Sequence, residues 1–210
     1  MKSMYSVILS EELVKRLDAV AYENGVSRSV MLNKILADYL CVETPDTIME
    51  NIFSRMEAMF SEVAGMRFIN QASNSMASVT SALEYRYNPK VKYALELFPA
   101  GDLGQLKVSL RSQNPALIAL LEDFYSFFIY LERKYIGERV YYYGEERFVR
   151  VFIRPKGLTA NELGDEIAKY VRRFDSYLRK YFAGLNDITN TKLQIEAQYV
   201  TALSNMEVRL

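Results

Sequence analysis

The segment that most constrains this chain is MYSVILS, residues 4–10, because it alternates like a strand and leads directly into a helix. Successive side chains of a strand point to opposite faces. This sorts the segment into two nearly apolar sets: Tyr5, Val7 and Leu9, and Met4, Ser6 and Ile8. An isolated strand has no pairing partner. The sequence therefore predicts that two copies of the chain pair their strands antiparallel.

Two short helices are predicted to follow the strand. Ser10 is a good N-cap for the first, and Glu11 and Glu12 place negative charge where a helix N-terminus favours it. Gly25 suits the left-handed turn after this helix, and Ser27 caps the second. Each helix carries one apolar stripe at helical spacing: Leu13, Leu17, Val20 and Ala21 in the first, and Leu32, Ile35, Leu36 and Tyr39 in the second.

With these elements in this order, residues 2–43 resemble the ribbon-helix-helix family of DNA-binding proteins, of the Arc, MetJ and CopG type. The resemblance rests on alternating apolar residues before S-E-E, on a helix closed by Gly25, and on the turn G-V-S-R-S that opens the second helix. It implies an obligate dimer whose two-stranded ribbon enters the DNA major groove, while the N-terminus of the second helix contacts phosphate.

The resemblance also implies roles for individual residues. The groove-facing positions of the strand are Met4, Ser6 and Ile8, and the phosphate contacts are Lys2, Ser27, Arg28 and Ser29. Met4 and Ile8 cannot hydrogen-bond to base edges, although they can contact thymine methyl groups. Two interpretations follow: the strand reads DNA shape and methyl groups, or its apolar outer face contacts protein and the unit only dimerises.

Residues 44–88 are predicted to form a long connecting helix. Thr44-Pro45-Asp46 is a typical helix start, with proline at the first helical position. From there apolar residues recur with alternating spacings of three and four: Met49, Ile52, Met56, Met59, Val63 and Met66. Asn70 continues this register, at a position where a buried asparagine can fix the alignment of two helices. We therefore expect this helix to contact a second copy as a coiled coil.

Residues 89–210 are predicted to form a C-terminal α+β domain. VKYALELF and QLKVSLR flank the turn PAGDLG and indicate a hairpin, and RVYYY and RFVRVFIRP around Gly144 indicate a second. A strongly apolar helix is expected between them, from Asn114-Pro115 to about Ile136.

A further helix is predicted to follow the second hairpin, because Thr159 and Glu162 have the spacing of a capping box. The predicted fold class is thus α+β, in three parts. These are a ribbon-helix-helix dimerisation unit over residues 1–43, the long connecting helix, and an antiparallel sheet with two helices in a ββαββα-like order.

The chain has no histidine and a single cysteine, Cys41. This removes the commonest general base, the commonest transition-metal ligand and every Cys–His or Ser–His nucleophile pair. We therefore expect no enzyme activity, no metal and no cofactor. Glu122 and Asp123 interrupt the most apolar run, LIALLEDFYSFFIYL, which predicts a buried helix and no membrane span. The expected location is the cytoplasm.

The most basic segment is residues 130–184, with 12 Lys and Arg against 8 Asp and Glu, whereas residues 1–43 carry a net charge of −1. Two sets of residues in this segment are candidates for secondary nucleic-acid contacts: Arg150 and Arg154, which alternate with Phe148 and Phe152 on one strand face, and Lys169, Arg172 and Arg173 on a helix. Aromatic and arginine residues on an open sheet can stack bases and hold phosphates. The alternative is that the aromatic rings pack under a helix and the basic residues are solvated.

These patterns favour a dimeric or higher-order protein that binds double-stranded DNA and represses transcription. Its C-terminal domain would serve oligomerisation, or would bind a protein partner or an effector. A plasmid partition, relaxation-complex accessory or DNA-organising protein is the alternative within the same chemistry. The alternative of another class is a protein-interaction scaffold whose N-terminal unit only dimerises.

Overall fold

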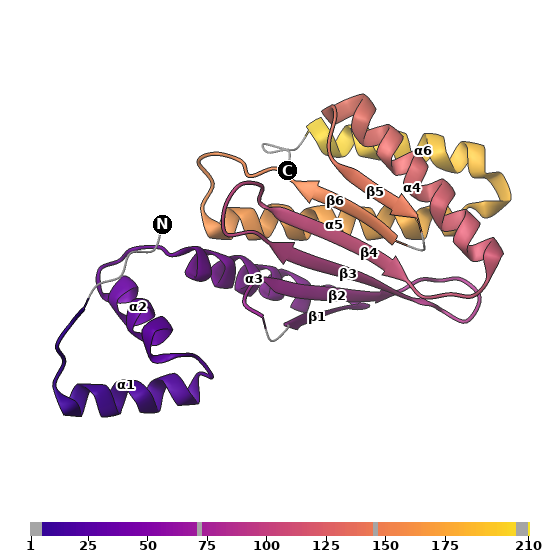
Figure 1. Ribbon diagram of the computed structural model, residues 1–210. Helices are drawn as coiled ribbons and strands as arrows, with labels where there is room; N and C mark the ends of the chain where they lie inside the picture. The colour runs from indigo at the N-terminus through magenta and orange to yellow at the C-terminus, as the bar shows by residue number, and fades with distance from the viewer. Residues whose placement is uncertain (1–5, 71–72, 145–146, 205–209) are drawn as a thin grey trace. The chain divides into compact units, whose positions relative to one another are not determined.

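A computed structural model of the chain describes residues 6–70, 73–144, 147–204 and 210 (Figure 1). The chain divides into two compact units, Met1–Thr44 and Pro45–Leu210. The described part of the first unit forms two helices, α1 (Glu11–Glu23) and α2 (Arg28–Tyr39).

The helix ends of the first unit follow their sequence signals. The Ser10 side chain accepts a hydrogen bond from the backbone N–H of Leu13 at 3.4 Å, and Ser27 accepts one from that of Val30 at 3.4 Å. Gly25 has a φ of 64°, in the left-handed region where a residue without a Cβ is favoured. Both predicted caps and the predicted turn are confirmed.

The predicted N-terminal ribbon is wrong. Residues 6–10 lie outside any helix or strand, and the first strand among the described residues begins at Met66. An extended segment becomes a strand only when a neighbouring strand supplies backbone hydrogen bonds. All described strands of this chain pair with one another, further along the sequence. Ser6 and Ile8 lie in the unpaired segment, whereas Lys2 and Met4 lie outside the described residues.

The predicted long helix over residues 44–88 is also wrong. α3 (Pro45–Ser61) stops before Gly65, which has a φ of 81°, and the chain continues as β1 (Met66–Asn70) and β2 (Met76–Ala82). The apolar stripe of α3 is buried within its own unit, so it is not available to a second copy as a coiled-coil seam. Its buried members are Met49, Ile52, Phe53, Met56 and Phe60.

The second unit is built on one antiparallel sheet, whose described strands have the order β1-β2-β3-β4-β6-β5. Its remaining strands are β3 (Lys90–Leu97), β4 (Gly104–Leu110), β5 (Tyr141–Gly144) and β6 (Arg147–Phe152). β3 pairs with β4 and β5 with β6, which confirms both predicted hairpins. Burial alternates along β3, β4 and β6, and Ala77 and Val79 of β2 pair with buried residues of β3. One face therefore carries the core: Ala77, Val79, Val91, Tyr93, Leu95, Leu106, Val108, Phe148 and Phe152.

Helices pack against this face of the sheet. α4 (Pro115–Ile136) joins the two hairpins, and α5 (Ala160–Ala183) begins with the predicted capping box. A short 3-10 helix (η1, Leu185–Asp187) leads to α6 (Ile188–Ser204), which packs on α4 and α5 (Figure 1). The C-terminal fold therefore has β1, β2, α3 and α6 in addition to its predicted elements. No helix in the described ranges is long and apolar enough to cross a membrane.

Gly164 sets how closely α3 and α5 approach each other. A Cβ atom at this position would lie 2.8 Å from the carbonyl oxygen of Ile52 and 2.9 Å from Cβ of Arg55. Arg55 also joins the two helices through an ion pair with Asp165, with 2.5 Å between Nε and Oδ1. The side of α5 that carries Gly164 therefore has no room for a methyl group.

We expect Gly164→Ala to lower the free energy of unfolding by about 1–3 kcal/mol, because the added methyl group must push the two helices apart. At an exposed helix position the same change would raise stability by about 1 kcal/mol. The sign of the stability change in Gly164→Ala therefore shows whether α3 and α5 approach each other closely at this position. The matched control is Ser176→Ala, on the exposed side of α5, for which no loss is expected. Urea unfolding followed by circular dichroism measures both, and an equal or higher stability of Gly164→Ala would contradict the close approach.

Candidate functional site

The first unit leaves most of its large apolar side chains exposed. Its buried cluster consists of Leu17, Ala21 and Met31. Eleven large apolar side chains are exposed in the described part of this unit, against nine in the described part of the much longer second unit. We call these eleven residues the N-terminal apolar surface: Val7, Ile8, Leu13, Val20, Tyr22, Val30, Ile35, Leu36, Tyr39, Leu40 and Val42.

The centre of this surface is the apolar stripe of α2. Ile35, Leu36 and Tyr39 are 45%, 46% and 83% exposed, and Leu32 on the same stripe is only partly buried. An amphipathic helix normally buries such a stripe against a core. Here the stripe has the spacing of a core-facing surface, yet within the described part of its unit only Leu32 packs on the buried cluster, and Ile35, Leu36 and Tyr39 stay exposed.

The N-terminus of α2 is the second feature of this unit. Ser27, Arg28 and Ser29 are all exposed, and the first turn of α2 contains no acidic residue. The first turn of α1, by contrast, carries Glu11 and Glu12. A helix N-terminus has free backbone N–H groups and a positive dipole end, which favour an anion. Of these two helix starts, that of α2 is the one suited to a phosphate.

Arg28 is already engaged by a carboxylate on α1. Its Nε and Nη2 donate to Oδ1 and Oδ2 of Asp18 at 2.5 Å and 2.6 Å. Hydrogen bonding to Arg28 lowers the pKa of Asp18 below its ordinary value. Both side chains are about half exposed, and exposed ion pairs contribute little to stability. A phosphate could therefore replace Asp18 as the partner of Arg28 at little cost.

The predicted secondary contacts in the second unit do not form one basic surface. Arg150 is 1% exposed, so it is closed to a polynucleotide. The reason is that its strand face lies under the helices, together with Phe148 and Phe152. The other four predicted residues differ in their surroundings. Arg154 donates to the carbonyl oxygens of Phe98, Gly101 and Asp102, Lys169 pairs with Glu166, Arg172 is exposed, and Arg173 is partly buried.

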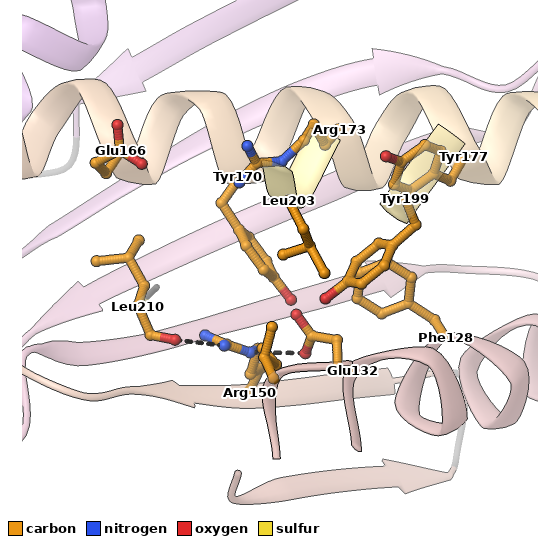
Figure 2. A pocket seen from close by; sticks show the side chains of 11 residues that line it. Phe128, Glu132, Arg150, Glu166, Tyr170, Arg173, Tyr177, Tyr199, Leu203 and Leu210 are labelled. Carbon is orange, nitrogen blue, oxygen red and sulfur yellow. Dashed lines mark hydrogen bonds and ion pairs between the residues drawn. The ribbon is translucent and has the colours of Figure 1, made fainter. Parts of the chain in front are cut away.

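Arg150 instead forms the centre of a buried polar site. Its Nε donates to Oε2 of Glu132 at 2.8 Å, and the hydroxyl of Tyr141 donates to the same oxygen at 2.7 Å. Its Nη2 donates to the main-chain oxygen of Leu210 at 2.6 Å. Figure 2 shows the side chain of Tyr170 pointing toward this pair, and Cζ of Arg150 lies 4.7 Å from the centre of its ring. We call this group the Arg150 site.

Opposing effects act on the charge of Arg150. Burial lowers the pKa of its guanidinium, while Tyr170, Glu132 and Tyr141 raise it, and the net result lies above the ordinary value for arginine. Burial also raises the pKa of the Tyr170 hydroxyl well above its ordinary value. Both shifts favour a charged Arg150 and a neutral Tyr170 hydroxyl near neutral pH.

Sequence reasoning named Arg150 for another role and missed the rest of the site: Glu132, Tyr141, Tyr170 and Leu210. One signal was available for Glu132. It follows Leu121, Tyr125 and Phe128 at helical spacing, so it belongs to the buried stripe of α4. A carboxylate on such a stripe requires a buried cation as its partner.

The described residues contain no group of three or more His, Cys, Asp or Glu side chains that could hold a metal ion. Comparisons of the chain with protein-family models, with curated proteins and with solved structures find no match.

Proposed function

We propose that the chain is a self-associating DNA-binding protein whose role is transcriptional repression. In this proposal two copies pair through the N-terminal apolar surface, and the N-terminus of α2 in each copy contacts a DNA phosphate. The observation that carries the proposal is the exposed part of the α2 stripe, formed by Ile35, Leu36 and Tyr39.

A second copy of the same unit is the occupant that best fits this surface. Chains below about 40 residues usually need disulfides, metals or oligomerisation to be stable. The first unit is close to that limit, and its buried cluster has only three residues. The single cysteine of the chain, Cys41, cannot form a disulfide within it. A symmetric pair would bury the stripe of each copy against the same stripe of the other.

Two observations support DNA as the ligand of such a pair. The start of α2 offers exposed Ser27, Arg28 and Ser29 with no neighbouring carboxylate in its own first turn. These are also the residues to which the family resemblance gives a phosphate-binding role. Pairing two copies would present two such helix starts to one duplex, and each phosphate contact would release counterions from the DNA.

Fluorescence anisotropy with duplex DNA from the gene's own upstream region, and with a scrambled duplex, tests this proposal. We expect Arg28→Gln to weaken binding and to reduce the salt slope by about one for each Arg28 in the complex. Asp18→Asn should strengthen binding, because it releases Arg28. The control is Arg16→Gln, which removes an exposed arginine of α1 that pairs with Glu12. Absence of binding at low salt, or equal effects of Arg28→Gln and Arg16→Gln, would contradict a phosphate contact by Arg28.

A protein-interaction scaffold is the second candidate function. The bidentate ion pair of Arg28 with Asp18 and the net charge of −1 over residues 1–43 favour it, because both reduce the attraction to DNA. In that case the wild-type chain would still self-associate, yet neither duplex would change its anisotropy. Fluorescence anisotropy together with sedimentation equilibrium, which measures self-association, therefore separates the two candidates.

A further inference from the structure

The Arg150 site contains buried polar atoms that no described partner satisfies. Nη1 of Arg150 and the hydroxyl of Tyr170 have no hydrogen-bond partner within the described part of the chain. The two residues are 1% and 7% exposed. A buried polar group left unpaired costs about 1–3 kcal/mol. Two such groups beside one cavity indicate that a species with acceptor atoms belongs there.

The cavity itself is almost full. Its volume is about 20 Å³, which leaves room for about one water molecule. Leu210, whose side chain is buried, is part of the lining of this cavity. The main-chain oxygen of Leu210 accepts hydrogen bonds from Arg150 Nη2 at 2.6 Å and from Arg139 Nε at 3.4 Å. A ligand larger than water must therefore take the place of Leu210.

Leu210 shows what chemistry the site accepts. Its main-chain oxygen accepts a hydrogen bond from the guanidinium group of Arg150, and its branched apolar side chain extends from there on the side of Glu166, another residue of the lining (Figure 2). The apolar part of the lining is formed by Phe128, Ile136 and Leu203. An oxygen acceptor joined to a short branched hydrocarbon would reproduce both contacts.

The charges around the cavity favour an anion. Glu132 neutralises one guanidinium group through its ion pair with Arg150. Glu166, the other carboxylate of the lining, pairs with Lys169 at 2.8 Å. Arg173 also lines the cavity, and burial lowers the pKa of its guanidinium. An incoming carboxylate would relieve that cost and would match the planar fork of Arg150.

We propose that the Arg150 site binds a small carboxylic acid with a branched apolar chain, and that Leu210 occupies the site within the chain until such a ligand displaces it. The carboxylate accepts hydrogen bonds from Nη1 and Nη2 of Arg150 and from the hydroxyl of Tyr170. The branched chain takes the place of the Leu210 side chain. This proposal concerns the second unit alone and stands whether or not the first unit binds DNA.

Isothermal titration calorimetry with 4-methylpentanoate tests the proposal on the full chain and on a variant that lacks residues 205–210. The full chain should bind weakly, because Leu210 competes, and the shortened chain at least about tenfold more tightly. If the shortened chain does not fold, Leu210→Gly supplies the comparison, and its affinity for the acid should be at least about threefold higher than that of the full chain. The uncharged 4-methylpentanamide should bind at least about tenfold more weakly than the acid.

Tyr170→Phe tests the role of the unpaired hydroxyl. It should weaken binding of the acid by about three- to tenfold, the range expected for one hydrogen bond. The control is Tyr142→Phe, which changes an exposed tyrosine and should have no effect. Thermal melts followed by circular dichroism establish that each variant is folded. The proposal is overturned if neither the full nor the shortened chain binds the acid at about 10 mM, which is the result expected of a cavity that holds only water. It is also overturned if the amide binds as tightly as the acid, or if Tyr170→Phe binds the acid as tightly as wild type.

Discussion

Glu132→Ala is expected to lower the free energy of unfolding by about 3–5 kcal/mol, because it leaves the charge of Arg150 buried without a partner. Both side chains of this ion pair are 1% exposed, and 2.8 Å separates Nε of Arg150 from Oε2 of Glu132. The hydroxyl of Tyr141 loses its acceptor in the same variant. Urea unfolding followed by circular dichroism measures the loss.

Two variants show whether this loss comes from the unpaired charge. Glu138→Ala removes a carboxylate that is 81% exposed and pairs with Arg133, so its effect should be small. Adding Arg150→Met to Glu132→Ala removes the stranded cation and should restore most of the lost stability. A loss below about 1 kcal/mol in Glu132→Ala would show that the pair is not desolvated, contrary to the structure.

Leu36→Asp is expected to raise the dissociation constant of the self-associated chain by at least about 100-fold. Burial of an unpaired carboxylate in an apolar interface costs about 3 kcal/mol or more. Leu36 is 46% exposed in the single chain, so the fold of one copy should tolerate the change. Sedimentation equilibrium at several protein concentrations measures the dissociation constant.

Lys34→Asp is the matched control for this variant. Lys34 lies on the same helix but on the side away from the stripe, and its substitution changes the net charge more than Leu36→Asp does. It should leave the dissociation constant within about threefold of wild type, because exposed charges act weakly at distance. Equal weakening by both variants would mean that charge alone, and not the N-terminal apolar surface, controls association.

Local signals predicted much of this fold. The capping box at Thr159 and Glu162, the caps at Ser10 and Ser27, and both C-terminal hairpins depend on residues close together in the sequence. Such elements can be read from one sequence, because the hydrogen bonds and turns that define them are local.

The wrong predictions arose where the spacing of apolar residues was ambiguous, or where the element that packs on a segment lies far away in the sequence. Between residues 63 and 80 the spacing of apolar residues fits both a helix and a pair of strands, and pairing of β2 with β3 decides between them. Leu13 and most of the α2 stripe have the helical spacing of a core-facing surface, yet they are exposed within the described first unit. Periodicity identifies an apolar face but does not identify what packs against it.

The Arg150 site could not be predicted from the sequence for the same reason. Strand periodicity placed Arg150 on the same face as Phe148 and Phe152, and this pattern alone allowed a solvated side chain. The helical spacing that puts Glu132 on the buried face of α4 was present in the sequence but was not used. Only the packing of α4 over β6 brings these two opposite charges together, and Leu210 reaches the site from a distant part of the sequence.

Sedimentation equilibrium of the wild-type chain at micromolar concentration tests most directly whether the first unit pairs two copies. The chain has a mass of 24.3 kDa. Pairing through the N-terminal apolar surface predicts a species of twice that mass, which dissociates to single chains in Leu36→Asp. A wild-type protein that remains a single chain at this concentration would contradict the pairing, and with it the proposed DNA-binding assembly.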